Sequence, residues 1–238
     1  MRKIFVTGGA GGLGMAIVRK HLSLGDRVWA ADVKSNREME RLAAEEGRLT
    51  FLLCDVASTE SVRETLLPLL DEIGRLDFLY SCAGVYDFAD KVQLPETDLD
   101  HAAAMYNIDA VGFLRVVQAL FPVIRDGTDI LCVTSEAGSM SANWRSREYS
   151  YCMSKAAENM ACVLLQKHYD EAGQRTRVMC LHPGWVRSAM GGEEAKKHPE
   201  MSVSPEDSAE ALVGIALDLD GIPKECMYMD YQRKPYSW

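Results

Sequence analysis

The sequence predicts an α/β fold with a single doubly wound parallel sheet of about seven strands and helices on both faces. Two observations predict this fold class. Short apolar segments alternate with longer amphipathic ones along the whole chain, as in consecutive β–α units. The short segments are apolar at nearly every position, which is typical of parallel strands buried on both faces. Right-handed crossovers then distribute the helices over the two faces.

In the first half of the chain, apolar runs predict four strands and amphipathic spacing predicts three helices. Pro68 lies inside the third helical pattern, where a missing N–H group kinks or shortens a helix. The strands are expected at Ile4–Val6, Arg27–Asp32, Leu49–Cys54 and Phe78–Ser81, and the helices at Gly12–Leu24, Arg37–Glu46 and Thr59–Ile73.

The second half continues the alternation. Ser204 followed by Pro205 is a strong helix start, with a capping hydroxyl and a proline in the first turn. Strands are expected at Ile130–Thr134, Val178–Leu181 and Met227–Met229, and helices at about Leu99–Ile124, Tyr149–Ala172 and Pro205–Leu219. Two stretches without a regular pattern, Glu136–Glu148 and Gly184–Val203, follow strands. Ligands of such sheets bind beyond the carboxyl ends of strands, so both stretches are expected near the ligand.

Composition limits the partners of the chain. Its 238 residues are 47% hydrophobic, and we expect one domain spanning residues 1–238. A net charge of −9 without a basic block argues against nucleic acid as a partner. No apolar run reaches the ~18 residues of a membrane span, so no membrane partner is expected. The N-terminal apolar stretch, Ile4–Val6, is too short for a signal peptide.

The cysteines indicate a reducing, cytoplasmic location. There are seven, an odd number, and none forms a CxxC pair. Most lie in apolar runs, so we interpret them as small buried hydrophobic residues. No cluster of His, Cys and Asp has metal-ligand spacing, so no metal is expected.

A glycine-rich segment follows the first predicted strand and opens the first predicted helix. It reads TGGAGGLG at Thr7–Gly14. Glycines let backbone N–H groups approach a pyrophosphate, and the start of the helix favours negative charge. Glycines also make ordinary tight turns, but this strand–helix context favours a dinucleotide site of the Rossmann type. The absence of GKS or GKT argues against an NTPase loop.

Asp32 ends the second predicted strand. A carboxylate there can accept hydrogen bonds from the hydroxyls of an adenosine ribose, and it repels a 2′-phosphate. Its alternative role is that of a loop or helix-capping residue. We therefore favour NAD(H) as the cofactor, and the nearby Lys34 and Arg37 keep NADP(H) as the alternative.

Tyr151 and Lys155 are four residues apart on a predicted helix, so they share one face. An ammonium group beside a phenol stabilises the phenolate and lowers the tyrosine pKa. Such a phenol can act as a general acid for a ketone or as a general base for an alcohol. Ser135 ends the preceding strand, and its hydroxyl can hydrogen-bond the reacting oxygen.

These residues are part of a wider similarity to a known family. The sequence resembles the short-chain dehydrogenase/reductases in a series of segments in family order. They are TGGAGGLG at Thr7–Gly14, CDV at Cys54–Val56, CAG at Cys82–Gly84, Asn107, TSEAGS at Thr134–Ser139, YCMSK at Tyr151–Lys155 and HPGWVRS at His182–Ser188. They cover nearly the whole chain and are specific in combination.

The resemblance implies roles for four residues in catalysis. Tyr151 would be the acid/base, Lys155 would hold the nicotinamide ribose, and Ser135 would polarise the substrate carbonyl. Asn107 would anchor a water that links Lys155 to solvent. The resemblance also implies a homodimer or homotetramer. The implied cofactor contacts, besides Tyr151 and Lys155, are Gly8, Ala10, Gly11, Gly12, Leu13, Gly14, Asp32, Asp55, Val56, Ala83, Gly84, Pro183, Gly184, Val186 and Ser188.

The sequence departs from the family pattern in two places. The usual Asn-Asn-Ala-Gly reads Ser81–Gly84 here, which weakens an expected tie between strands. The spacing from Ser135 to Tyr151 is longer than usual, so Ser139 is a rival for the catalytic hydroxyl, although we prefer Ser135. The run HPGWVRSAMGG further resembles sniffer and C-factor-like carbonyl reductases, which generally use NADPH, whereas Asp32 argues for NAD.

We therefore expect an enzyme that transfers a hydride between a nicotinamide cofactor and a small carbonyl compound or secondary alcohol. The residues at 184–203 would form a short substrate loop. An apolar pocket is expected from Tyr86, Phe88, Trp144, Trp185 and Met190, with packing of the loops as the equally weighted alternative. The alternative function is that of a catalytically silent dinucleotide-binding regulator or scaffold. A sensor need not keep all four catalytic residues, which favours the enzyme.

Overall fold

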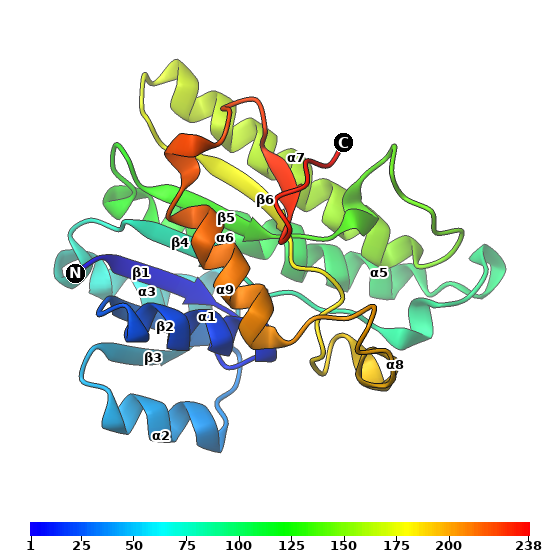
Figure 1. Cartoon of the computed structure of the whole chain (residues 1–238), viewed down its shortest axis with the longest axis horizontal. Helices are drawn as coiled ribbons and strands as arrows, with labels where there is room; N and C mark the ends of the chain where they lie inside the picture. The colour runs from blue at the N-terminus through cyan, green and yellow to red at the C-terminus, as the bar shows by residue number, and fades with distance from the viewer.

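The computed structural model describes residues 1–238 and contains one seven-stranded sheet (Figure 1). The strand order is β3-β2-β1-β4-β5-β6-β7, and every neighbouring pair is parallel. The strands are β1 Lys3–Thr7, β2 Arg27–Asp32, β3 Leu49–Leu53, β4 Phe78–Ser81, β5 Asp129–Val133, β6 Val178–His182 and β7 Tyr228–Asp230. The predicted fold class is confirmed. The strand order reverses between β1 and β4, which is where doubly wound sheets bind ligands.

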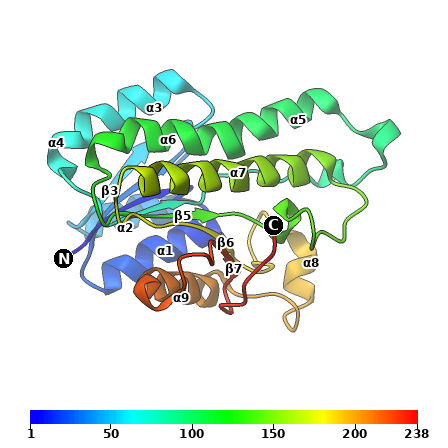
Figure 2. The same ribbon diagram turned by 90° about the horizontal axis from the view of Figure 1, so that it is seen from above.

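Helices cover both faces of the sheet (Figure 2). On one face lie α1 Gly12–Ser23, α2 Arg37–Glu45 and α9 Pro205–Ala216, and on the other lie α3 Thr59–Leu66, α4 Leu70–Ile73, α5 Leu99–Tyr106, α6 Gly112–Leu120 and α7 Tyr149–Glu171. A short helix, α8 Gly192–Lys197, lies beyond the carboxyl end of the strands (Figure 1). No helix combines the length and apolar character that crossing a membrane requires.

The sheet separates two hydrophobic cores of similar size, with 25 and 24 buried residues. Successive side chains of β1 alternate between them, since Phe5 belongs to one core and Ile4 and Val6 belong to the other. All three are fully buried. This explains why the strands are apolar at nearly every position.

The helix predicted over Leu99–Ile124 is interrupted. After α5 the chain forms a π-helical turn at Asn107–Val111 before α6 begins, and Phe121–Val123 continues as a 3₁₀ turn. A Cβ at Gly112 would lie 3.0 Å from Val56 Cγ2, so this point of the helix packs closely against the loop after β3. Single π turns are frequent at functional sites.

Pro68 acts as predicted, because α3 ends at Leu66 and a 3₁₀ turn leads into α4. The stretch Gly184–Val203 is more regular than expected. It contains α8, and Val186 pairs with Val203 in an isolated parallel bridge. With 6 residues, α8 is too short to produce a readable helical period.

Gly112→Ala is expected to destabilise the fold by about 1–3 kcal/mol, because its methyl group must displace Val56. Gly214→Ala in α9 is the matched control. Nothing lies within 4 Å of a Cβ there, so alanine is expected to stabilise the fold by about 0.5–1 kcal/mol. Urea unfolding of both variants checks the pair. Equal effects would contradict the close packing of the π turn.

Candidate active site

The glycine loop is shaped by close backbone contacts. Gly8 has a φ of +65°, and a Cβ there would lie 2.8 Å from the backbone nitrogen of Ala83. A Cβ at Gly14 would collide with the carbonyl oxygen of Gly8. Both positions therefore require glycine, and the loop after β1 lies directly against the loop after β4.

The start of α1 is open to a ligand. Gly11 caps the helix without a side-chain hydrogen bond, and the first N–H groups of a helix have no partners within it. A Cβ at Gly12 would lie 3.0 Å from the side chain of Ser188, so the loop after β6 borders the same point. The loop leaves N–H groups free and has no room for a side chain. This arrangement suits the pyrophosphate of a dinucleotide.

Asp32 ends β2 beside this cradle. Its Oδ2 accepts a hydrogen bond from the backbone N–H of Ala10 at 3.0 Å, which ties the strand end to the glycine loop. The Asn36 side chain donates to the carbonyl of Ala10 at 2.8 Å. A carboxylate oxygen has two lone pairs, so Asp32 retains acceptor capacity for ribose hydroxyls.

Thr7 supplies a tie that the sequence did not reveal. Its buried Oγ1 accepts hydrogen bonds from the N–H groups of Cys82 and Ala83 at 3.2 and 3.1 Å. The link between β1 and the loop after β4 is therefore intact, although Ser81 stands where the family usually has asparagine. Gly84 continues this loop toward Lys155, whose Nζ would lie 3.2 Å from a Cβ at Gly84.

The other predicted cofactor residues follow β3 and β6. Asp55 is held by its own turn, in which Oδ1 accepts the N–H of Ala57 at 2.9 Å. After β6, the carbonyl of Pro183 accepts the hydroxyl of Ser208 at 2.8 Å, and Gly184 has a φ of +81°. The structure thus brings the predicted segments after β1, β4 and β6 into direct contact along one edge of the sheet.

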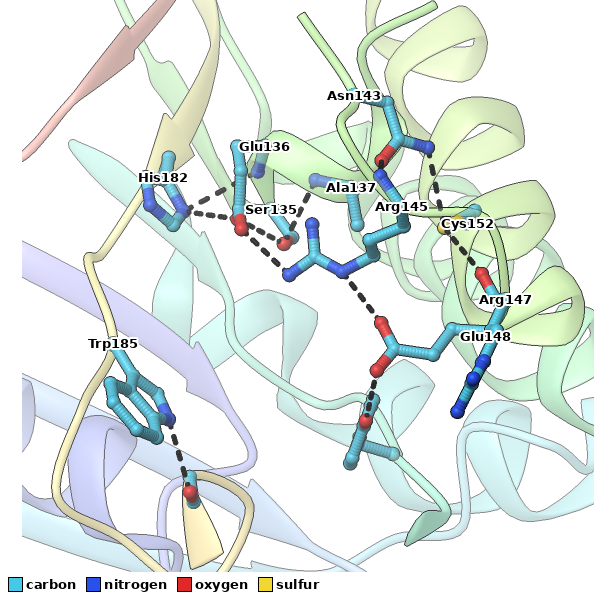
Figure 3. Close-up of polar contacts among 12 residues, drawn as sticks. Ser135, Glu136, Ala137, Asn143, Arg145, Arg147, Glu148, Cys152, His182 and Trp185 are labelled. Carbon is cyan, nitrogen blue, oxygen red and sulfur yellow. Dashed lines mark hydrogen bonds and ion pairs between the residues drawn. The ribbon is translucent and has the colours of Figure 1, made fainter. Parts of the chain in front are cut away.

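Ser135 follows β5 and lies in a dense polar network (Figure 3). Its Oγ donates to Glu136 Oε2 at 2.7 Å and accepts the N–H of Ala137 at 3.2 Å. Glu136 also contacts Arg145 at 2.7 Å and His182 Nδ1 at 3.3 Å. Burial alone would raise the pKa of Glu136, but His182 and Arg145 outweigh it, so the pKa of this carboxyl is lowered.

Arg145 extends the network to a second carboxylate. Its Nε lies 2.6 Å from Glu148 Oε2, and the hydroxyl of Tyr86 donates to Glu148 Oε1 at 2.8 Å. Glu148 has a left-handed backbone with a φ of +65°, which is strained for a residue with a side chain. The Tyr86 ring meets that of Tyr151 edge-on at 4.9 Å. The network therefore links Ser135 to Tyr86, the aromatic neighbour of Tyr151.

Tyr151 lies in the first turn of α7. The buried carboxylate of Asp90 accepts its backbone N–H at 3.1 Å and the hydroxyl of Ser150 at 2.9 Å, which fixes the start of the helix. Burial raises the pKa of Tyr151, while the charge of Lys155 and a hydrogen bond with Ser135 act in the opposite direction. The pKa of Tyr151 is raised overall, because burial outweighs Lys155 and Ser135, so the lowered pKa expected from the sequence is not found.

Asn107 does not lie where the sequence placed it. Its amide donates to the carbonyl of Ala57 at 3.1 Å and its Oδ1 accepts from Arg115 at 2.7 Å, so it points away from Lys155. Asp109 occupies the expected place instead, with its Oδ2 3.9 Å from Lys155 Nζ. The sequence contains a pattern that places Asp109 inside the protein, because Asp109 shares a helical face with Met105 and Phe113, which are both buried.

Ser139 turns away from Tyr151. Its hydroxyl donates to the carbonyl of Ser237 at 2.7 Å and accepts the N–H of Ala142 at 2.9 Å. This geometry leaves Ser135 as the hydroxyl beside Tyr151.

The expected pocket aromatics separate into two groups. Tyr86 packs edge-on against Phe88 at 5.0 Å, next to Tyr151. Trp144 is 76% exposed and stacks under the Arg145 guanidinium. Trp185 donates to the carbonyl of Gly191 at 3.1 Å, which fastens the loop after β6 (Figure 3).

Known proteins match the chain over most of its length. The family model described as short chain dehydrogenase matches residues 2–199. The 1-hydroxy-2-glutathionyl-2-methyl-3-butene dehydrogenase of Rhodococcus sp. (strain AD45) is 32% identical over 216 residues, 90% of this chain and 89% of that protein. C-signal of Myxococcus xanthus is 34% identical over 169 residues, 69% of this chain and 94% of that protein.

Two solved structures share the whole fold. Carbonyl reductase Sniffer of D. melanogaster has a TM-score of 0.85 at 21% identity, with 100% of both chains covered. The NADPH-bound carbonyl reductase from chicken fatty liver has a TM-score of 0.85 at 23% identity, covering 100% of this chain and 99% of that one. With C-signal, these matches confirm the expected likeness to the sniffer and C-factor-like subgroup.

Arg145→Met is expected to lower the free energy of unfolding at neutral pH by about 2 kcal/mol, because Glu136 and Glu148 lose a shared partner. In the unmutated protein, the lowered pKa of Glu136 contributes stability that is lost as the pH falls. The difference between the proteins should therefore be largest near neutral pH and shrink below about pH 4.

Urea unfolding at several pH values checks this prediction. Arg175→Met is the control, since that side chain is 81% exposed in its pair with Asp126 and should leave stability unchanged. A pH-independent loss in Arg145→Met would refute the electrostatic role.

Proposed function

The chain belongs to the short chain dehydrogenase family and is an oxidoreductase that uses a nicotinamide cofactor, and from this premise we propose a specific reaction. The protein transfers a hydride between NAD(H) and a small secondary alcohol or carbonyl compound, with Tyr151 as the general acid/base. The convergence of Tyr151, Ser135 and Lys155 at the carboxyl edge of the sheet is the observation that carries the proposal.

The chain's own groups move and orient the proton. In oxidation, the Tyr151 phenolate accepts the proton of the alcohol hydroxyl, and in reduction the phenol returns it to the carbonyl oxygen. The Lys155 ammonium favours the phenolate, and Ser135 holds the reacting oxygen in place. The nicotinamide supplies the hydride chemistry when bound. Asp109 replaces Asn107 as the polar neighbour of Lys155.

NAD(H) is the proposed cofactor because of Asp32. Its carboxylate stands at the end of β2 and is tied to Ala10, where it can accept ribose hydroxyls and repel a 2′-phosphate. The proposed binding residues after β1, β3, β4 and β6 remain those expected from the sequence. We treat residues 1–238 as one domain, with 184–203 as the substrate loop.

The proposed substrate is small and partly apolar. Tyr86 and Phe88 supply an aromatic wall beside Tyr151. Arg145 is already paired with two carboxylates, so it does not offer a free charge to an anionic substrate. All seven cysteines are free, which supports the proposed reducing cytoplasm.

We also propose a homodimer or homotetramer. The helices α5, α6 and α7 expose large hydrophobic side chains, which in water favour association. They include Leu99, Tyr106, Leu114, Met153, Met160 and Leu164. Light scattering that finds only monomer would contradict this part of the proposal.

Tyr151→Phe is expected to reduce turnover by roughly 10²–10⁴-fold, because the proton acceptor is lost. NADH binding should persist. The measurement is NADH absorbance with a panel of ketones and secondary alcohols, beside NADH fluorescence titration. Tyr169→Phe is the control, because that buried hydroxyl on the same helix has no hydrogen-bond partner. Unchanged turnover in Tyr151→Phe would overturn the mechanism, and no turnover by the unmutated protein would favour a regulator.

Asp32→Ala is expected to weaken NADH binding about tenfold, because hydrogen bonds to a charged acceptor are lost. NADPH binding should not weaken, since the repulsion of its 2′-phosphate disappears. Fluorescence titration with both dinucleotides measures the change. Tighter binding of NADPH than of NADH by the unmutated protein would reverse the cofactor assignment.

A further inference from the structure

Lys155 is shared by two buried carboxylates. Its Nζ lies 2.8 Å from Glu158 Oε2 and 3.9 Å from Asp109 Oδ2. The Lys155 side chain is 4% exposed, and both carboxylates are fully buried. The proposed mechanism uses Lys155 and places Asp109 beside it, but it leaves Glu158 without a role.

Both carboxylate oxygens of Asp109 accept hydrogen bonds. Its Oδ1 accepts the N–H of Val85 at 3.0 Å, and its Oδ2 accepts the hydroxyl of Ser154 at 2.7 Å. Donors therefore face both oxygens of Asp109.

Glu158 has a different environment. Its Oε2 accepts from Lys155, whereas its Oε1 is buried without a hydrogen-bond partner. The titratable and charged groups that face it are Lys155, Asp109 and the thiols of Cys82, Cys132, Cys162 and Cys180. Burial raises the pKa of each thiol, so these groups are neutral and supply no charge to balance Glu158.

The buried charges do not cancel. One ammonium faces two carboxylates, and an unbalanced charge away from water is costly. A proton on Glu158 restores neutrality. Burial raises the pKa of Glu158 to about 7, with Asp109 adding to the effect and with Lys155 and the thiol of Cys132 opposing it.

We propose that Glu158 is a positioning residue that holds Lys155 from behind and that it gains and loses one proton, which regulates how strongly Lys155 favours the Tyr151 phenolate. When Glu158 is protonated, Lys155 is balanced by Asp109 alone. When Glu158 loses the proton, the cluster carries a net negative charge, which opposes the phenolate. The link to catalysis rests on the proposed role of Tyr151, whereas the proton on Glu158 does not.

Infrared spectroscopy of the whole protein tests the proton directly. A protonated carboxyl band should be present in mildly acidic solution and should disappear with a midpoint near neutral pH. Glu158→Gln should remove this band. Asp129→Asn is the matched control, since Asp129 lies at the opposite end of β5 and burial raises its pKa to about 6. The proposal would be overturned if Glu158→Gln removes no carboxyl band. If that variant does not fold, a lack of any titrating band in the unmutated protein would overturn it.

The near-ultraviolet absorbance of phenolate tests the link to Tyr151 without a substrate. The difference between proteins with Tyr151 and with Tyr151→Phe isolates this residue. In the Glu158→Gln background the ionisation midpoint should fall by about one pH unit, because a nearby negative charge is removed. Asp129→Asn should leave it unchanged. An unchanged midpoint in Glu158→Gln would refute the link, even if Tyr151→Phe still abolishes turnover.

Discussion

The site depends on the contact between the backbones of two loops that leave neighbouring strands. Gly8 lies against the Cys82–Ala83 peptide so closely that any side chain would collide with it, and Thr7 fastens the same loop by two hydrogen bonds. Because β1 and β4 are adjacent at the point where the strand order reverses, this contact fixes both the start of α1 and the position of Gly84.

The polar groups around the reacting centre alternate in charge. Glu136, Arg145 and Glu148 form one chain, and Asp109, Lys155 and Glu158 form another. Isolated charges in such a buried place would be unfavourable, so each chain persists only as a unit. Ser135 joins the first chain and Tyr151 contacts both, through Tyr86 on one side and Lys155 on the other.

The sequence predicted features that depend on local patterns. The apolar runs placed β2 and β4 at their observed bounds, and Pro68 marked a real break. The position expected for Asn107 differs from the structure, because the expectation rested on residue type and not on which face of the helix the residue occupies. The helical period puts Asp109 on the buried face instead. The partners of Arg145 could not be predicted, although Glu148 and Glu136 are only 3 and 9 residues away, because the loop between β5 and α7 that holds all three has no regular period.

The strained backbone of Glu148 makes this position a compromise between two demands. Glycine would relax the left-handed conformation but would remove the carboxylate that Arg145 and Tyr86 share. The stability of the fold and the organisation of the active site therefore favour different residues at position 148. Engineering this chain for heat resistance by relieving that strain would loosen the wall beside Tyr151.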